Sequence, residues 1–109
     1  MKYITFTVPC YNSQDYMRRC IDSLLVYQDE VEIIIVDDGS TDATPQIADA
    51  YAKQFPGTVR VIHKENGGHG SGVNAGLAAA KGEYFKVVDS DDWLDARSLQ
   101  KVLFRIMHW

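Results

Sequence analysis

The feature that most constrains the fold is a run of contiguous β-branched residues, Ile33 to Val36, within the predicted strand 31–36. A strand that is apolar at successive positions is typical of a parallel sheet covered by helices on both faces. Three more segments with strand composition are predicted, at residues 3–8, 59–63 and 84–88.

Segments with helical periodicity separate these strands. The first two helices are predicted to begin after Asn12 and Asp42 as N-caps, and the third to end near Lys81 with Gly82 as its C-cap. A last helix is predicted from Ala96, capped by Asp95, with Leu99, Val102, Leu103 and Ile106 on its buried face. Alternation of strand and helix predicts an α/β fold with right-handed crossovers: a Rossmann-like, three-layer α/β/α domain with a parallel sheet of order 3-2-1-4.

Length and composition narrow the functional classes. The chain has 109 residues, which fits one domain. Its 15 acidic and 11 basic residues argue against a nucleic-acid-binding surface. No apolar run approaches the roughly 20 residues of a membrane span, and the N-terminus lacks signal-peptide features, so we expect a cytoplasmic protein. Cys10 and Cys20 are interpreted as free, buried, small apolar residues.

Acidic residues follow two of the predicted strands. Asp37 and Asp38 come after the second strand, and Asp89, Asp91 and Asp92 come after the fourth. In open parallel sheets ligands bind at the carboxyl ends of the strands, so these five carboxylates are expected at one edge. Two unit charges about 4 Å apart repel by about 4 kcal/mol at an effective dielectric constant near 20. A bound Mg²⁺ or Mn²⁺, which prefers oxygen ligands, would explain the cluster.

Other features carry weaker signals. The loop 66–70 is glycine-rich, but it is neither a dinucleotide fingerprint nor a P-loop, and we interpret it as a turn. A phosphate contact at the start of the following helix is left open. His63, His69 and His108 are interpreted as residues without a ligand role. Trp93 fits a sugar-stacking platform and a core anchor equally well.

Several short motifs, taken in order, resemble one family. They are Val8-Pro9-Cys10-Tyr11-Asn12, Ile35-Val36-Asp37-Asp38-Gly39-Ser40-Thr41-Asp42, Glu65-Asn66-Gly67-Gly68, Asn74-Ala75-Gly76-Leu77, Lys81-Gly82-Glu83-Tyr84 and Val88-Asp89-Ser90-Asp91-Asp92-Trp93. Each is weak alone, but their order and spacing over residues 3–95 resemble family 2 glycosyltransferases of the GT-A fold.

The resemblance implies inverting transfer of a sugar from a nucleotide-diphosphate donor, UDP-sugar in most relatives, to a glycan or lipid-linked acceptor. It implies a Mn²⁺ or Mg²⁺ ion, and a role in cell-wall or polysaccharide biosynthesis. The residues that it assigns to the donor are Pro9, Tyr11, Asp37, Asp38, Asn66, Asp89 and Asp92, and the metal ligands are Asp91 and Asp89. Asp38 would contact the base, Pro9 the nucleoside and Asp89 the ribose.

Two departures from the family pattern matter. Many relatives carry Arg before the Asn that is Asn74 here, where this chain has Val73, and whole enzymes of the family are much longer. Residues 1–109 are therefore expected to be one nucleotide-sugar-binding domain, inactive alone, with the catalytic base in a part beyond Trp109.

Two rival functions also fit the sequence. One is a non-catalytic nucleotide-binding or assembly module. The other is a Mg²⁺-dependent phosphoryl-transfer domain, which the acidic pair disfavours because it follows the second strand rather than the first. An exposed face, where the rest of a longer protein would pack, predicts self-association. Membrane attachment of such a longer protein is left open.

Overall fold

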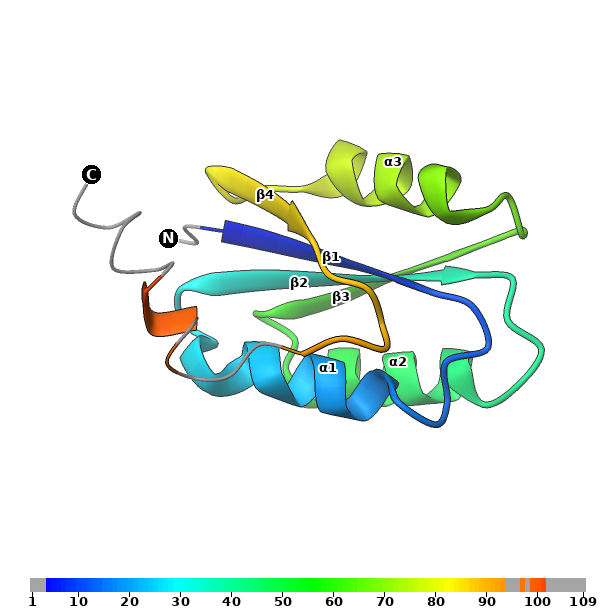
Figure 1. The fold of residues 1–109 in the computed structure, drawn as a ribbon, viewed down its shortest axis with the longest axis horizontal. Helices are drawn as coiled ribbons and strands as arrows, with labels where there is room; N and C mark the ends of the chain where they lie inside the picture. Colours follow the sequence, from blue (N-terminus) through cyan, green and yellow to red (C-terminus); the bar gives the residue numbers. More distant parts are fainter. Residues whose placement is uncertain (1–3, 94–96, 98, 102–109) are drawn as a thin grey trace.

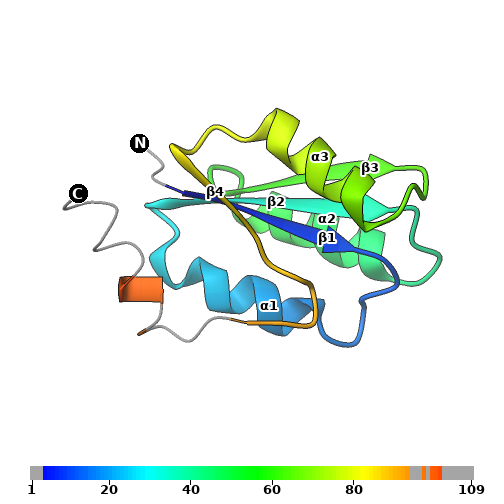
Figure 2. The same ribbon diagram turned by 45° about the horizontal axis from the view of Figure 1, so that its top comes forward.

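The computed structural model describes residues 4–93, 97 and 99–101. Its elements are β1 (Ile4–Cys10), α1 (Met17–Leu24), the short 3-10 helix η1 (Leu25–Tyr27), β2 (Val31–Asp38), α2 (Thr44–Gln54), β3 (Val59–Lys64), α3 (His69–Ala79) and β4 (Tyr84–Val87). The strands form one parallel sheet in the order β3-β2-β1-β4. Helices α1 and α2 cover one face and α3 covers the other (Figures 1 and 2). The predicted three-layer fold and strand order are confirmed.

The two faces of the sheet are packed differently. All eight residues of β2 are buried, as the contiguous apolar run predicts. Phe6 and Ile33, which are paired in register, belong to the core cluster that also contains the buried side chains of α1. On the other face α3 presents small residues, and a Cβ built on its Gly72 would lie 3.4 Å from Pro9 Cβ. Helix α3 therefore lies close to the sheet.

Strands β1 and β2 each end two residues later than predicted, at Cys10 and Asp38. The ladder continues because Cys10 pairs with Asp37, and Asp37 in turn pairs with His63 on β3. Asp37 and Asp38 are consequently part of the strand and almost fully buried, not loop residues that follow it.

The two predicted N-caps have different outcomes. The prediction for Asn12 is wrong, because α1 begins at Met17. Asn12 instead adopts a left-handed backbone, with φ of 49°, and its side-chain oxygen accepts a hydrogen bond of 2.8 Å from the Thr41 amide. It therefore ties the loop after β1 to the loop after β2. The prediction for Asp42 is off by one residue, because the N-cap of α2 is Ala43; Asp42 Oδ1 still accepts a hydrogen bond of 2.8 Å from the Thr44 amide at the start of α2.

Helix α3 ends at Ala79, before Lys81, so the predicted C-cap at Gly82 is wrong. The backbone after the helix instead forms hydrogen bonds with side chains of the sheet. The Lys81 amide donates to Glu32 Oε1, and the Gly82 amide donates to Thr5 Oγ1, both at 2.8 Å. Buried Glu32 thus anchors the chain that connects α3 to β4.

The predicted last helix lies mostly outside the described residues, as do Asp95, Ala96, Val102, Leu103 and Ile106. Leu99 is described, and it is fully buried as predicted. None of the helices in the described part of the chain is long and apolar enough to cross a membrane.

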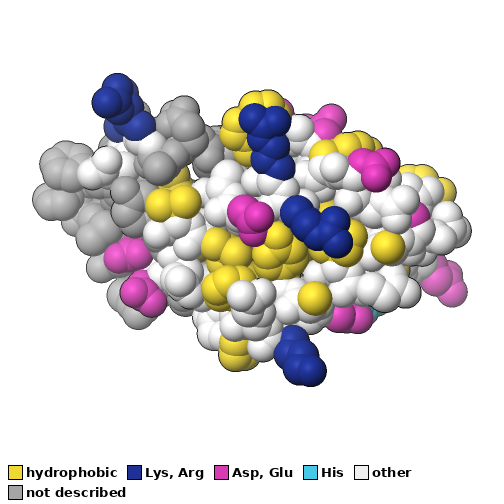
Figure 3. Space-filling view, turned by 90° about the horizontal axis from the view of Figure 1, so that it is seen from below, with side chains coloured by type: hydrophobic (Ala, Val, Ile, Leu, Met, Phe, Trp, Pro, Cys, Tyr) yellow, Lys and Arg dark blue, Asp and Glu magenta, His cyan; other side chains and the backbone are white. Residues whose placement is uncertain are grey.

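Helices α1 and α2 form a face on which hydrophobic side chains gather between charged ones (Figure 3). A groove of about 290 Å³ lies there, lined by Ile47 and Tyr51 of α2, by Phe55 just after it, and by Arg18 and Asp22 of α1, among others. Self-association through an exposed face stays a prediction.

Candidate active site

A cavity of about 440 Å³ lies at the carboxyl edge of the sheet. Its walls come from the ends of β1 and β2, the start of α3 and the loop after β4. The lining residues are Pro9, Cys10, Tyr11, Ser13, Tyr16, Asp38, Asn66, Gly68, His69, Asp89, Ser90 and Asp91. Six of the residues assigned from the sequence are in this set: Pro9, Tyr11, Asp38, Asn66, Asp89 and Asp91. Asp37 and Asp92 adjoin it in the chain.

Asp38 holds the glycine-rich loop against the end of β2. Its carboxylate accepts hydrogen bonds from Lys64 Nζ at 2.8 Å, from the Gly67 amide at 2.9 Å and from the Gly68 amide at 3.0 Å. The hydrogen bond from Lys64 is the main cause that holds the pKa of Asp38 below its usual value, against the effect of desolvation. Asn66 Nδ2 donates to the Asp38 carbonyl at 3.1 Å. Asp38 and the loop that it holds therefore form one fixed wall of the cavity, which we call the Asp38 wall. The loop is thus more than a turn.

Asp37 lies behind this wall in a chain of three side chains. Its Oδ2 is 2.9 Å from His63 Nδ1, and His63 Nε2 is 2.8 Å from Asp49 Oδ1 on α2. Asp37 Oδ1 also accepts a hydrogen bond of 3.1 Å from the Ser40 amide. The hydrogen bonds to Asp37 and then Asp49 raise the pKa of His63. His63, interpreted from the sequence as a residue without a ligand role, thus has a structural one.

These pairings offset much of the repulsion that the sequence predicts among the five carboxylates. Five carboxylates do follow β2 and β4, but Asp38 is paired with Lys64 and Asp37 with His63. Protein side chains therefore balance the charge at the end of β2. The unbalanced acidic cluster consists of the three aspartates of the loop after β4.

The pairing of His63 predicts a pH dependence. A raised pKa means that its contribution to stability is fully present below the unfolded value of about 6.5 and is lost as pH rises through the folded pKa. The ring is 43% exposed, so the effect is small. Between about pH 6 and about pH 9 we expect the free energy of unfolding of wild type to fall by only up to about 1 kcal/mol relative to that of His63→Gln. Urea unfolding of both proteins across this range measures the difference, and parallel curves would contradict the prediction.

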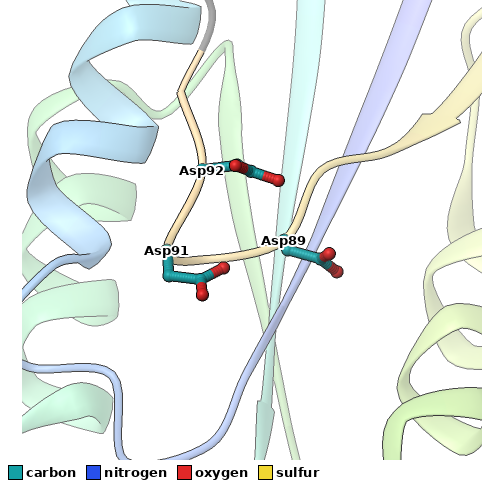
Figure 4. Close-up of side chains that lie close together, drawn as sticks. All are labelled: Asp89, Asp91 and Asp92. Atoms are coloured by element: carbon teal, nitrogen blue, oxygen red, sulfur yellow. The ribbon is translucent and has the colours of Figure 1, made fainter.

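The acidic loop after β4 carries Asp89, Asp91 and Asp92, which are all exposed (Figure 4). One carboxylate oxygen from each lies within 4.8 Å of the others. The Asp92 amide donates to the Asp89 carbonyl at 2.9 Å, which closes a turn. Three carboxylates at this spacing fit a hard divalent cation such as Mn²⁺ or Mg²⁺, which takes oxygen ligands and leaves further positions to phosphate or water.

Two contacts fasten the acidic loop to the chain around α1. The hydroxyl oxygens of Ser90 and Ser13 are 2.8 Å apart and share a hydrogen bond. The guanidinium of Arg19 lies over the Trp93 ring, 3.4 Å from its centroid. Trp93 is 47% exposed, so it is not a core anchor, and Arg19 already covers one face of the ring.

Sequence reasoning missed several residues of the cavity, including Ser13, Tyr16, Ser90 and His69. The sequence predicts no ligand role for His69, but this residue begins α3 and lines the cavity, with Nε2 3.9 Å from Asp89 Oδ1. Its position after the glycine pair, at the same edge as the aspartates, was the available signal.

Cys10 lines the cavity as well, but it has no exposed area. Burial raises the pKa of its thiol to about 12, and that of Cys20 to about 12 for the same reason. Both thiols are free and stay protonated at neutral pH, which confirms their interpretation as small buried residues.

Solved structures of glycosyltransferases share this fold. A crystal structure of S. aureus TarS in complex with UDP-GlcNAc has a TM-score of 0.86 and is 34% identical, and the match covers 99% of this chain and 32% of that chain. A mannosyltransferase from Pyrobaculum calidifontis, PcManGT, in complex with GDP-Man and Mn²⁺, has a TM-score of 0.82 at 27% identity, covering 95% of this chain and 32% of that one. The structural neighbours are GT-A glycosyltransferases.

Curated relatives agree. Glycosyltransferase GlyG of Streptococcus pneumoniae is 48% identical over 82% of this chain and 30% of its own length. The poly(ribitol-phosphate) beta-glucosyltransferase of Bacillus spizizenii is 39% identical over 88% of this chain and 16% of its own length. The chain thus spans less than a third of either relative. Residues 5–108 match the family described as Glycosyl transferase family 2. Because that match covers nearly the whole chain, the chain belongs to glycosyl transferase family 2.

Proposed function

We propose that residues 1–109 form the donor-binding domain of an inverting glycosyltransferase, and that the donor is a nucleotide-diphosphate sugar, UDP-sugar in the first instance. The main observation in support is that the Asp38 wall and the acidic loop line the same cavity. The UDP-GlcNAc complex of TarS supports the choice of donor. A glycan or lipid-linked acceptor is proposed by analogy with the poly(ribitol-phosphate) enzyme.

The nucleoside is proposed to bind against the Asp38 wall. An ionised carboxylate has about four acceptor positions, and the three protein hydrogen bonds to Asp38 leave one for an N–H of the base. Asn66 beside it and Pro9 across the strand ends complete this wall. Tyr11 is 52% exposed and offers an apolar surface to the nucleoside. Asp37 acts indirectly, because it fixes the backbone at Ser40 after the strand.

The diphosphate is proposed to bind at the acidic loop. Asp91 and Asp89 would hold Mn²⁺ or Mg²⁺, with Asp92 close enough to contribute, and Asp89 would also lie near the ribose. A bound metal ion supplies positive charge that stabilises the leaving diphosphate. The contacts of the loop with Ser13 and Arg19 position the carboxylates. The general base and the acceptor site are proposed to come from sequence beyond these residues.

The rival functions are not favoured. A Mg²⁺-dependent phosphoryl-transfer domain is disfavoured by the membership in glycosyl transferase family 2. A purely non-catalytic module has no observation of its own in its favour. The choice between Mn²⁺ and Mg²⁺ and a cytoplasmic location stay predictions.

We expect UDP and Mn²⁺ to stabilise the chain cooperatively. Three exposed carboxylates bind a metal ion weakly alone, and a diphosphate adds ligands, so each ligand should raise the affinity for the other by the same factor, about tenfold. Asp91→Asn keeps the shape of the side chain and removes its charge, and it should abolish this coupling. The measurement is a thermal-shift grid with UDP and Mn²⁺ each present and absent.

The matched control for this grid is Asp49→Asn, which removes an exposed carboxylate of α2 that belongs to neither wall of the cavity. It should keep the full coupling. Asp91→Asn should melt no earlier than wild type without ligands, because it relieves repulsion within the acidic loop. A wild-type chain that gains no extra stabilisation from the pair of ligands would refute the metal-bridged donor site.

A further inference from the structure

We propose that His69 binds the diphosphate of the donor, as the basic side chain that the cavity directs at the leaving group. The proposal rests on the proposed function and adds to it a residue outside the motifs that carry the family resemblance. His69 is the first residue of α3, and its ring is 63% exposed.

The charges in the cavity point to this role. Three carboxylates line it, from Asp38, Asp89 and Asp91, and His69 is the one basic side chain among the described lining residues. A diphosphate carries at least two negative charges and must enter a cavity of the same sign. A metal ion at the acidic loop offsets part of this repulsion, and a hydrogen-bond donor on the facing wall is needed for the oxygens that the metal does not reach.

The neighbouring basic side chains are already engaged. Lys64 Nζ donates to Asp38 at 2.8 Å and to the Glu65 carbonyl at 2.6 Å. His63 has a carboxylate at each ring nitrogen. Arg19 lies over Trp93. These three groups hold the surrounding chain together, and none of them is among the described residues that line the cavity.

His69, by contrast, makes no hydrogen bond through its ring within the described part of the chain. Its nearest charged partner is Asp89, at 3.9 Å between Nε2 and Oδ1, which is beyond hydrogen-bond distance. The ring therefore faces the acidic loop across a gap, on the side where the diphosphate is proposed to lie. A phosphate oxygen placed between the two walls would accept its N–H.

No other residue of α3 carries a basic side chain. The helix, with the sequence His-Gly-Ser-Gly-Val-Asn-Ala-Gly-Leu-Ala-Ala, contains neither Lys nor Arg. Val73 follows His69 by one helical turn, on the same side of α3, and it is apolar. The basic side chain of α3 is thus located at the first residue of the helix.

The chemistry requires no proton transfer. A neutral imidazole donates one hydrogen bond from whichever nitrogen carries the proton, and the phosphate oxygen accepts it. The interaction favours a ligand with a diphosphate over a nucleoside that has none, because only the diphosphate reaches from the Asp38 wall to the acidic loop. His69 therefore discriminates between ligands by phosphate content.

The test is calorimetry on the 109-residue chain with Mn²⁺ present, using uridine and UDP as ligands. His69→Ala should weaken UDP binding about tenfold and leave uridine binding within about twofold of wild type. His69→Gln keeps an N–H donor and should recover part of the loss. Lys53→Ala removes an exposed cation in the last turn of α2 and should change neither affinity. Matched melting temperatures show that the variants are folded.

Four results would overturn the proposal. UDP affinity that is unchanged in His69→Ala would show that the ring makes no contact with the ligand. An equal loss for uridine and UDP would show that His69 only shapes the nucleoside wall. Failure of His69→Gln to exceed His69→Ala would show that hydrogen-bond donation is not the cause. A wild-type chain that binds no UDP overturns the proposed function itself, and this inference with it.

Discussion

Asp38→Ala is expected to lower the free energy of unfolding by about 3 kcal/mol, because breaking one partner of a largely buried charge pair leaves the other uncompensated. The side chain of Asp38 is 7% exposed and that of Lys64 is 21% exposed. The substitution also releases the amides of Gly67 and Gly68 from the end of β2. Chemical unfolding in urea measures this loss.

The same substitution is expected to weaken nucleotide binding by about tenfold or more, since a lost hydrogen bond to a charged group is worth about 1.5–3 kcal/mol. Uridine and UDP should lose affinity alike, because the base contact is common to both. Asp49→Ala is the control, since its carboxylate is 63% exposed and should be worth at most about 1 kcal/mol in stability. A normal affinity for uridine in a folded Asp38→Ala protein would limit Asp38 to a structural role.

Gly76→Ala is expected to destabilise the chain by about 3 kcal/mol, the upper part of the range for overpacking a core. A Cβ at this position of α3 would lie 2.3 Å from Thr7 Cγ2 and 2.4 Å from Thr7 Oγ1. Thr7 is fully buried on β1, so the helix must move away from the sheet to relieve the contact. The melting temperature should fall by about 12 °C or more, at about 4–8 °C per kcal/mol for a domain of this size.

A control and a rescue make this prediction specific. Gly70→Ala lies in the same helix with nothing within 4 Å of its Cβ, so it should stabilise by up to about 1 kcal/mol through helix propensity. Thr7→Ala removes the two atoms in closest contact, and combined with Gly76→Ala it should restore part of the lost stability. Additive effects of the two substitutions would argue against the contact as the cause.

Much of the fold follows from patterns that sequence reasoning can see. The contiguous apolar run of β2 reports burial on both faces, and that burial is the physical reason why β2 lies inside the sheet. Asp89, Asp91 and Asp92 lie within one short stretch, so their proximity is local and could be predicted. Pro9 and Asn66 line the same cavity because strands of a parallel sheet end at the same edge.

The remaining features depend on register and on distant partners, which periodicity does not determine. Asp38 pairs with Lys64 only because β2 and β3 align these residues side by side. Asn is a residue type that favours helix N-caps. The side chain of Asn12 instead accepts a hydrogen bond from the Thr41 amide, 29 residues further along the chain. Trp93, which is 47% exposed, has Arg19 of α1 over its ring and does not lie in the core. Tertiary contacts overrode local preference in each case.

The close contact between α3 and the sheet also sets the dimensions of the cavity. Gly72 of α3 lies against Pro9, which is itself part of the cavity wall, and His69 stands at the end of the same helix. A side chain at Gly76, whose Cβ would lie within 3 Å of Thr7 on β1, would push the helix outward and carry its first turn away from the acidic loop. The glycines of α3 that face the sheet thus set the width of the ligand site. The size of ligand that fits is therefore governed by residues that do not line the cavity.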